Sequence, residues 1–308
     1  MGEILRVEDL KKYFATKKGT LHAVDGVTFT VEAGKTLGIV GESGCGKSTL
    51  GRVILHLHER TEGRIVFQGE DISDVSNAKL KELRKDMQII FQDPSACLNP
   101  RRTIRQILME PFEIHHLTGK IDVNARIEEL LHLVGLDTYH LSRYPHEMSG
   151  GQKQRIGIAR ALVMEPEFIV ADEPISALDV SIRAQVLNLL NSMKKSRGLT
   201  YLFIAHDLSV VRFISDRIAV ISKGRIVELA EAEELFLHPL HPYTKALLSA
   251  VPIPDPGLEK SKKLLVYDPS IHDYSVDKPV WEEIANGHFV YGNQKELEGY
   301  RKEYQSQL

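Results

Sequence analysis

The sequence of 308 residues predicts an α/β fold built on a mostly parallel sheet, and two patterns support this prediction. Short apolar runs rich in β-branched residues recur along the chain, as is typical of strands buried on both faces. They occupy residues 37–40, 87–91, 168–171, 202–205 and 218–221. Amphipathic stretches between several of them predict helices at 47–58, 122–135, 150–164 and 180–196. This alternation indicates a sheet covered by helices.

The remaining segments predict parts added to this core. Residues 93–148 interrupt the strand pattern and look helical, whereas 21–31 and 64–67 look like antiparallel strands that flank the main sheet. Val251–Gly257 is rich in proline and predicts a linker, followed by a polar tail of weak periodicity. The predicted division is a core of 1–92 and 149–250, a helical insertion of 93–148 and a C-terminal extension of 251–308.

Composition excludes several classes of protein. The net charge is −3, from 39 Lys and Arg against 42 Asp and Glu, so we expect no nucleic-acid partner held by a broad basic surface. Cys45 and Cys97 are too few for a disulfide framework and fit a reducing compartment. The sequence shows no signal peptide and no apolar run of the ~18 residues that a membrane-spanning helix needs. We therefore expect a soluble chain that reaches a membrane only through a partner.

Polar residues follow four of the predicted strands at the point where each strand ends. They are the glycine-rich segment from Gly41, then Gln92, the pair Asp172–Glu173, and His206. Ligand sites in open α/β sheets lie just beyond the carboxyl ends of strands. We expect these residues to meet at one edge of the sheet.

Residues 41–49 read Gly-Glu-Ser-Gly-Cys-Gly-Lys-Ser-Thr and match the phosphate-binding pattern G-x-x-x-x-G-K-[ST]. Backbone N–H groups of such a loop and the N-terminus of the following helix bind phosphates. Lys47 is expected to reach the β- and γ-phosphates of ATP, and the Ser48 hydroxyl to bind Mg²⁺. A thiol at a helix N-terminus, such as Cys45, can have a lowered pKa, but a small residue tolerated at a variable position explains its presence better. The nucleotide-binding candidates in the loop are Ser43, Gly44, Cys45, Gly46, Lys47, Ser48 and Thr49.

The apolar run that ends in Asp172 predicts a second element of the same site. Asp172 is expected to hold Mg²⁺, and Glu173 to polarise the water that attacks the terminal phosphate. An apolar run ending in two acids is a weak signal alone, and it becomes strong after a phosphate loop. The sequence therefore predicts a P-loop NTPase.

Met148-Ser-Gly-Gly-Gln152 resembles the LSGGQ signature of ABC ATPases, with Met in place of Leu. Ser149 is suited to cap the predicted helix, and the glycines allow close approach to an anion. The resemblance implies that Gln92 is the Q-loop glutamine, which contacts nucleotide and metal. It further implies that Ser176–Asp179 is the D-loop, that His206 is the catalytic switch histidine beside Lys47 and Glu173, and that Tyr13 stacks on adenine.

The same resemblance implies that two cassettes pair head to tail. Ser149, Gly151 and Gln152 then serve nucleotide that is bound to the partner chain. Because only the γ-phosphate of ATP supplies contacts to both chains, hydrolysis reopens the pair.

Two further stretches, 91–100 and 238–252, are similar to those of oligopeptide and dipeptide permease cassettes. D-type subunits of these permeases commonly carry several cysteines after the linker, whereas no Cys follows Cys97 here, so no iron–sulfur cluster is expected. With the segment Asn286–Tyr291, this indicates an F-type subunit. The implied partners are a D-type cassette, two transmembrane permease subunits and, indirectly, an extracytoplasmic peptide-binding protein, with this chain peripheral on the cytoplasmic face of the cell membrane.

Three alternatives remain open. Nickel and glutathione importers use closely similar cassettes. A soluble ABC ATPase of DNA repair or translation is opposed by the single cassette and its short spacing. A degenerate cassette that binds ATP as a scaffold is opposed by the presence of both Glu173 and His206.

Overall fold

The computed structural model shows the chain as two compact units. It describes residues 2–17, 19–119, 121–176, 178–252 and 262–307. The first unit contains residues 1–2, 32–35 and 74–202, and the second contains 3–31, 36–73 and 203–308. The predicted domain boundaries stay predictions, and the predicted linker at 251–257 lies largely outside the described residues.

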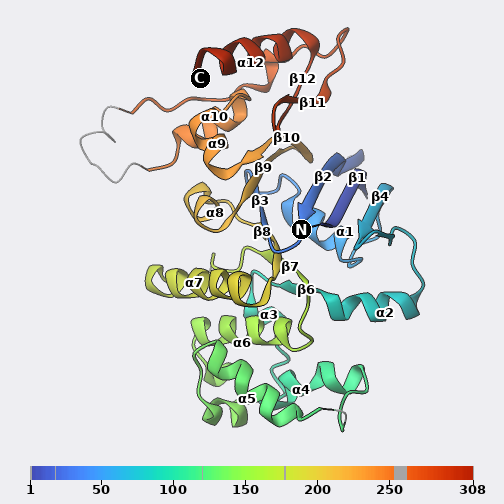
Figure 1. Cartoon of the computed structure of the whole chain (residues 1–308), viewed down its shortest axis with the longest axis vertical. Helices are drawn as coiled ribbons and strands as arrows, with labels where there is room; N and C mark the ends of the chain where they lie inside the picture. Colours follow the sequence, from blue (N-terminus) through green and yellow to red (C-terminus); the bar gives the residue numbers. More distant parts are fainter. Residues whose placement is uncertain (1, 18, 120, 177, 253–261, 308) are drawn as a thin grey trace. The chain divides into compact units, whose positions relative to one another are not determined.

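The first unit contains a parallel strand pair and most of the helices (Figure 1). Strand β6 (Met87–Ile90) runs parallel to β7 (Phe168–Asp172), and every residue of β7 is buried. Strand β8 (Thr200–Ile204) begins in this unit, where the N–H of Thr200 donates to the carbonyl of Glu167. The buried runs predicted at 87–91 and 168–171 are confirmed as strands.

Capping residues in the sequence set where these helices begin. Ser149 caps α6 (Gly150–Leu162), and Asp122 caps α5 (Val123–Leu133) through a bond from the N–H of Ala125. Gly198 ends α7 (Val180–Arg197) in the left-handed conformation that glycine adopts easily. The helices predicted at 122–135, 150–164 and 180–196 are thus confirmed to within two residues. The others are α2 (Asn77–Asp86), α3 (Pro94–Cys97), α4 (Ile104–Ile114) and the 3₁₀ helices Thr138–Ser142 and Pro145–Glu147.

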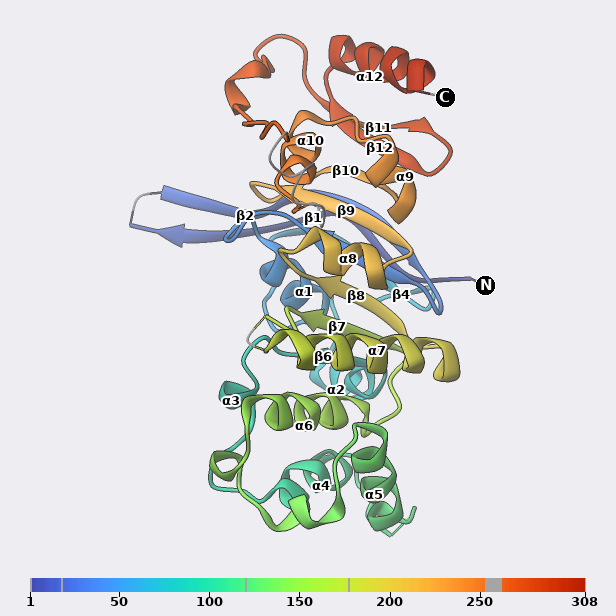
Figure 2. The same ribbon diagram turned by 90° about the vertical axis from the view of Figure 1, so that its left-hand side faces the viewer.

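The second unit contains a four-stranded sheet in the order β2-β1-β4-β5. Strand β1 pairs with β4 in antiparallel register, from Leu5 opposite Phe67. Figure 2 shows β1 and β2 as long ribbons. The strands predicted at 21–31 and 64–67 are confirmed, whereas β1 was not predicted. The bounds are β1 (Glu3–Thr16), β2 (Gly19–Glu32), β4 (Glu62–Phe67) and β5 (Glu70–Asp71).

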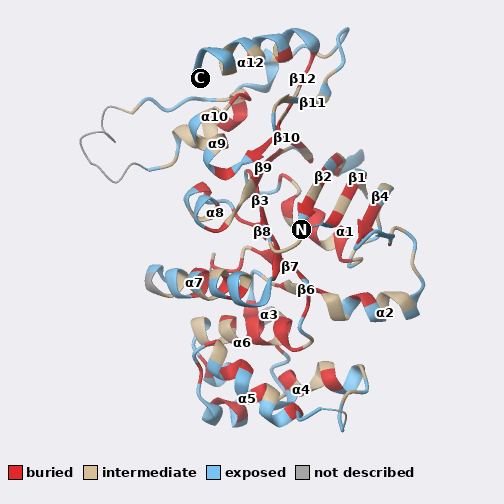
Figure 3. Ribbon diagram, viewed as in Figure 1, coloured by how far each residue is buried: buried red, intermediate tan, exposed pale blue. Residues whose placement is uncertain are grey.

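A second sheet of this unit has the order β11-β12-β10-β9-β3, and the end of β8 lies beside β3 through a bond from the N–H of Ala205 to the carbonyl of Ile39. Strand β9 runs parallel to β3, and the strands beyond β9 pair antiparallel. Buried residues dominate β3 and β9 in Figure 3. The bounds are β3 (Thr36–Val40), β9 (Arg217–Ser222), β10 (Arg225–Glu231), β11 (Val280–Ala285) and β12 (His288–Gly292).

The C-terminal tail is more ordered than its polar sequence indicates. It forms β11, β12 and α12 (Gln294–Gln307). A small core of Leu240, Val290, Leu297 and Tyr300 explains this, because these side chains are buried together. The remaining helices of the unit are α1 (Lys47–Ile54), α8 (Leu208–Ile214), α9 (Ala232–Leu237), α10 (Pro242–Ser249) and the 3₁₀ helix Pro269–Ile271.

Candidate functional site

The glycine-rich segment 41–49 connects β3 to α1 in the second unit, as predicted (Figure 1). Gly46 has φ 109°, and a Cβ there would lie 1.9 Å from the carbonyl oxygen of Ala23, so only glycine fits. Gly44 has φ 79°, and nothing lies within 4 Å of the position of its Cβ. The loop therefore packs closely on one side and leaves backbone accessible at Gly44.

Lys47 is 4% exposed and points into the curve of this loop. Its Nζ donates hydrogen bonds of 2.8 Å to the carbonyl oxygens of both Gly41 and Glu42. Ser43 and Gly44 are exposed, and Ser48 and Thr49 are half-buried in the first turn of α1. A buried cation within a turn of backbone beside a helix N-terminus is a site for phosphate.

The burial of Cys45 determines the pKa of its thiol. It is 9% exposed, and its burial raises the pKa of the thiol more than the nearby Lys47 ammonium lowers it. The lowered pKa that a helix N-terminus can produce is therefore not found, because burial outweighs it. Cys45 therefore acts in the loop as a small packed residue and not as a reactive thiolate.

Tyr13, at the end of β1, is held by a polar chain that the sequence did not reveal. Its hydroxyl donates to Asp25 Oδ1 at 2.6 Å, and its ring stacks on His22 with centroids 4.0 Å apart. Arg225 donates to the other oxygen of Asp25 at 2.5 Å and to the hydroxyl of Tyr291 at 3.3 Å. Burial works in the opposite direction, but Tyr13 and Arg225 hold the pKa of Asp25 below its usual value. Tyr13 is thus held by two residues of β2, and Arg225 of β10 holds Asp25 in turn.

His206 lies two residues after the end of β8, in the second unit, and is exposed. The next residue, Asp207, caps α8 by accepting bonds from the N–H groups of Ser209 and Val210. The local fold therefore presents His206 between a buried strand and a capped helix.

In the first unit, Gln92 and Glu173 are in direct contact. The side-chain amide of Gln92 donates to the carboxylate of Glu173 at 3.0 Å. Asp172 is 1% exposed at the end of β7. Glu173 has φ 47°, a conformation uncommon outside glycine, and its carbonyl accepts bonds from the N–H and hydroxyl of Ser176. Such a conformation is uncommon for a residue with a side chain, and strained backbone often clusters at active sites.

The segment around Ser149 forms a groove in the same unit. Ser149 and Gln152 make a reciprocal capping box at the start of α6, and Gln152 Nε2 lies 3.3 Å from the Nε2 of His140. A hollow of about 630 Å³ is lined by residues that include Ser149, Gly150, Gly151, Gln152, Leu178 and Asp179. Ala177 of the predicted D-loop lies outside the described residues. Exposed helix N–H groups around a hollow suit an anion.

Of the residues predicted from separate motifs, the structure brings Gln92 and Glu173 into direct contact. The loop, Tyr13 and His206 belong to the second unit, whereas Gln92, Asp172, Glu173 and the Ser149 segment belong to the first. The expected meeting of Lys47 with Glu173 at one sheet edge stays a prediction.

Comparison with known proteins assigns the family. A family model described as ABC transporter matches residues 24–176, and one described as oligopeptide/dipeptide transporter, C-terminal region, matches residues 227–276. The oligopeptide transport ATP-binding protein OppF of Bacillus subtilis is 53% identical over 97% of this chain and 99% of its own length. Its namesake from Streptococcus pyogenes serotype M1 is 55% identical over 98% and 99%. The chain belongs to the ABC transporter ATP-binding proteins.

Solved structures agree with this assignment. The dimeric post-hydrolysis structure of the ATP-binding cassette MJ0796, bound to ADP and Pi, has a TM-score of 0.67 and 27% identity, and covers 74% of this chain and 99% of that one. CbiO1 from Clostridium perfringens has a TM-score of 0.66 and 30% identity, covering 77% and 91%. The predicted family and α/β P-loop fold are confirmed. This ABC cassette is an ATP-binding ATPase subunit of a transporter, as predicted.

The sequence did not reveal the residues whose hydrogen bonds orient the candidate site residues. Asp25 contacts Tyr13, Arg225 contacts Asp25, and His140 contacts Gln152, and all three stand outside the motifs that the sequence reveals. Within the described residues, every helix is too short or too polar to cross a bilayer.

Proposed function

We propose that this chain is the ATP-hydrolysing subunit of an importer for oligopeptides or dipeptides. The observation that carries the proposal is the buried Lys47 ammonium inside the glycine loop at the start of α1. The peptide substrate is supported by relatives named for oligopeptide transport along nearly the whole chain. The C-terminal match at residues 227–276 supports the same branch.

The residues fit ATP and Mg²⁺. The backbone at Gly44 is exposed, and the space where its Cβ would stand is open to 4 Å, which leaves room for a phosphate. Ser48, Gln92 and Asp172 offer the oxygen donors that Mg²⁺ prefers. When bound, Mg²⁺ neutralises charge on the phosphate oxygens. We assign Ser48, Asp172 and Gln92 to the metal.

The chain's own residues bind the nucleotide and activate the attacking water. Lys47 and the loop N–H groups bind the phosphates, and Tyr13 stacks on adenine. Glu173 is oriented by Gln92 and accepts a hydrogen bond from the attacking water. This hydrogen bond makes the water a stronger nucleophile. We assign His206 to the terminal phosphate, whose charge grows as its bond to ADP breaks.

Partner chains complete the assembly. We propose that a second, D-type cassette places its loop against the groove at Ser149, Gly151 and Gln152, and that two permease subunits carry the pair. The dimeric cassette among the structural neighbours supports such pairing. In this proposal the chain lies on the cytoplasmic face of the cell membrane, and an extracytoplasmic peptide-binding protein delivers substrate to the permeases.

Lys47→Ala tests the nucleotide site. Calorimetric titration of the full chain should show ATP affinity reduced at least about tenfold, because charge-assisted contacts to phosphate are lost. Lys295→Ala, on the exposed face of α12, is the matched control and should bind ATP normally. Equal affinity of the two variants would refute the site.

Deletion of the gene tests the substrate. Uptake of a labelled oligopeptide should be lost, and uptake of nickel and of glutathione should persist. Intact peptide uptake with loss of nickel or glutathione uptake would replace the peptide proposal with the corresponding importer.

A further inference from the structure

The first turn of helix α10 is held in place by hydrogen bonds within the second unit. The imidazole Nδ1 of His241 accepts a bond from the N–H of Tyr243, and Pro242 occupies the first turn, where its missing N–H costs nothing. The side chain of Tyr243 therefore leaves the chain from a fixed first turn.

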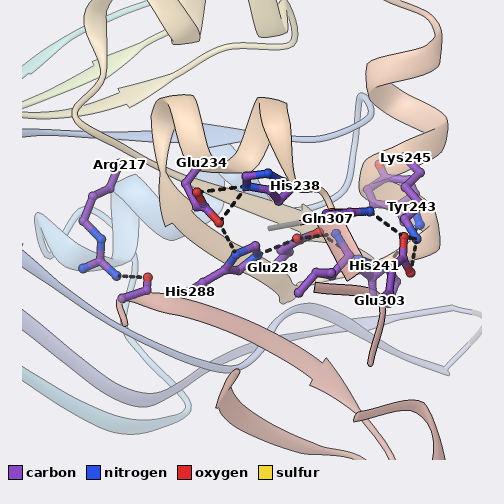
Figure 4. A network of polar contacts seen from close by, with 12 residues as sticks. Arg217, Glu228, Glu234, His238, His241, Tyr243, Lys245, His288, Glu303 and Gln307 are labelled. Atoms are coloured by element: carbon purple, nitrogen blue, oxygen red, sulfur yellow. Dashed lines mark hydrogen bonds and ion pairs between the residues drawn. The ribbon is translucent and has the colours of Figure 1, made fainter. Parts of the chain in front are cut away.

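Glu228 of β10 anchors the same segment. Its fully buried carboxylate accepts bonds from the N–H groups of Leu240 at 2.8 Å and His241 at 3.0 Å. The imidazole of His288, on β12, lies 2.8 Å from the same carboxylate, as Figure 4 shows. The start of α10 is thus fixed to two strands of the sheet.

Tyr243 extends from this anchored turn to the phosphate loop. Its side chain is 3% exposed, and its ring packs edge-on against Tyr267 with centroids 5.2 Å apart. The hydroxyl oxygen accepts a 3.0 Å hydrogen bond from the backbone N–H of Glu42. Burial raises the pKa of the Tyr243 phenol to about 12, so it remains neutral at physiological pH.

The N–H and the carbonyl of Glu42 are therefore both held. Tyr243 binds the N–H, and Lys47 binds the carbonyl. A loop whose first peptides are fixed needs less ordering when it closes on a phosphate chain. The carbonyls of Gly41 and Glu42 are also kept within hydrogen-bond distance of the Lys47 ammonium.

We propose that Tyr243 is a positioning residue for the phosphate loop, through which the C-terminal region tunes the affinity of this cassette for ATP. The proposal rests on the proposed ATP site but is separable from it. Lys47→Ala tests whether the loop binds ATP. A substitution of Tyr243 changes only how well the loop is preorganised for binding.

Tyr243→Phe is the test, since it removes one oxygen and keeps the ring. In the transporter assembled with its partner subunits, KM for ATP should rise about two- to tenfold, the range of one hydrogen bond, with kcat within about twofold. Tyr201→Phe is the control, because the buried hydroxyl of Tyr201 has no hydrogen-bond partner among the described residues. The control should leave KM unchanged.

Hydrogen–deuterium exchange of the full chain gives a second readout. In Tyr243→Phe, peptides covering 41–46 should exchange faster, while those covering β3 and β10 exchange as before. An unchanged KM, a fall in kcat at constant KM, or faster exchange throughout the second unit would each overturn the proposal. Failure of Lys47→Ala to weaken binding would instead overturn the ATP site itself.

Discussion

The side-chain amide of Gln92 donates a 3.0 Å hydrogen bond to the carboxylate of Glu173. This contact holds one carboxylate oxygen of Glu173, the residue that we propose polarises the attacking water. Glu173→Gln keeps the size of the side chain and removes its charge. We expect ATP binding to be retained and turnover to fall at least about a hundredfold, as for loss of a general base. Single-turnover ATPase assays of the assembled transporter measure this.

Gln92→Ala removes the contact that orients Glu173 and also the amide that we assign to the metal. It removes the amide but leaves the Glu173 carboxylate, so the expected loss of turnover is smaller, about tenfold. If Glu173→Gln retained near-normal turnover, Glu173 would not be the residue that polarises water. If Gln92→Ala were the more damaging change, the role of Gln92 at the metal would outweigh its contact with Glu173.

Tyr13 offers a test of base stacking. Its hydroxyl is bound to Asp25, and burial together with this bond raises the pKa of the phenol to about 12. Tyr13→Ala removes the ring and should weaken ATP binding by about 1–3 kcal/mol, the usual range for one stacked base. Tyr13→Phe keeps the ring and should cost much less. Fluorescence titration of the full chain measures both.

Inorganic tripolyphosphate is the control ligand for Tyr13, because it has phosphates but no base. Its affinity should be the same in Tyr13→Ala as in the unsubstituted chain. An equal loss for ATP and tripolyphosphate would show that Tyr13 supports the loop and does not stack on adenine.

His241 makes stability depend on pH. Burial, with the nearby His272 and Lys245, lowers the pKa of this imidazole to about 3. The unfolded chain binds a proton near pH 6.5 and the folded chain does not, so stability is complete above about pH 6.5 and falls as pH decreases toward 3. Between pH 7 and pH 5, the loss should be about 2 kcal/mol, measured by urea unfolding.

His241→Asn is the control for this pH dependence. Asn caps a helix well and does not titrate, so the variant should lose less stability between pH 7 and pH 5. Identical losses for both proteins would show that other groups cause the acid sensitivity.

The parts of the fold that the sequence predicted are those that local patterns determine. Strands β3, β7 and β8 are buried along their whole length and therefore read as continuous apolar runs. Strands β11 and β12 were missed, because only alternate residues of β12 are buried and its pairing depends on β10. A half-buried strand in a polar tail has no strong local signal.

Among the candidate site residues, too, only those that stand in a local sequence motif could be predicted. Lys47 and Glu173 stand in motifs and could be named, because their spacing carries the chemistry. Glu228 could not, since a buried glutamate looks like any surface glutamate until its partner His288 is placed beside it. Tyr243 is 201 residues from Glu42, and only the tertiary fold brings the two together.

Ser149 tests the groove at the start of α6. Ser149→Asp and Ser149→Asn both keep a good helix cap, so helix stability should be similar. The aspartate adds a negative charge where we propose the partner's terminal phosphate, and like charges repel strongly when water is excluded. In the assembled transporter, Ser149→Asp should therefore reduce ATPase at least about tenfold more than Ser149→Asn.

The isolated full chain distinguishes the two sides of this interface. Because Ser149 is assigned to nucleotide on the partner, ATP affinity of the isolated chain should be equal for Ser149→Asp, Ser149→Asn and the unsubstituted protein. A selective loss of affinity in Ser149→Asp would place the groove at this chain's own nucleotide. Equal ATPase of the two variants in the transporter would mean that no phosphate approaches Ser149, and that the head-to-tail arrangement is wrong.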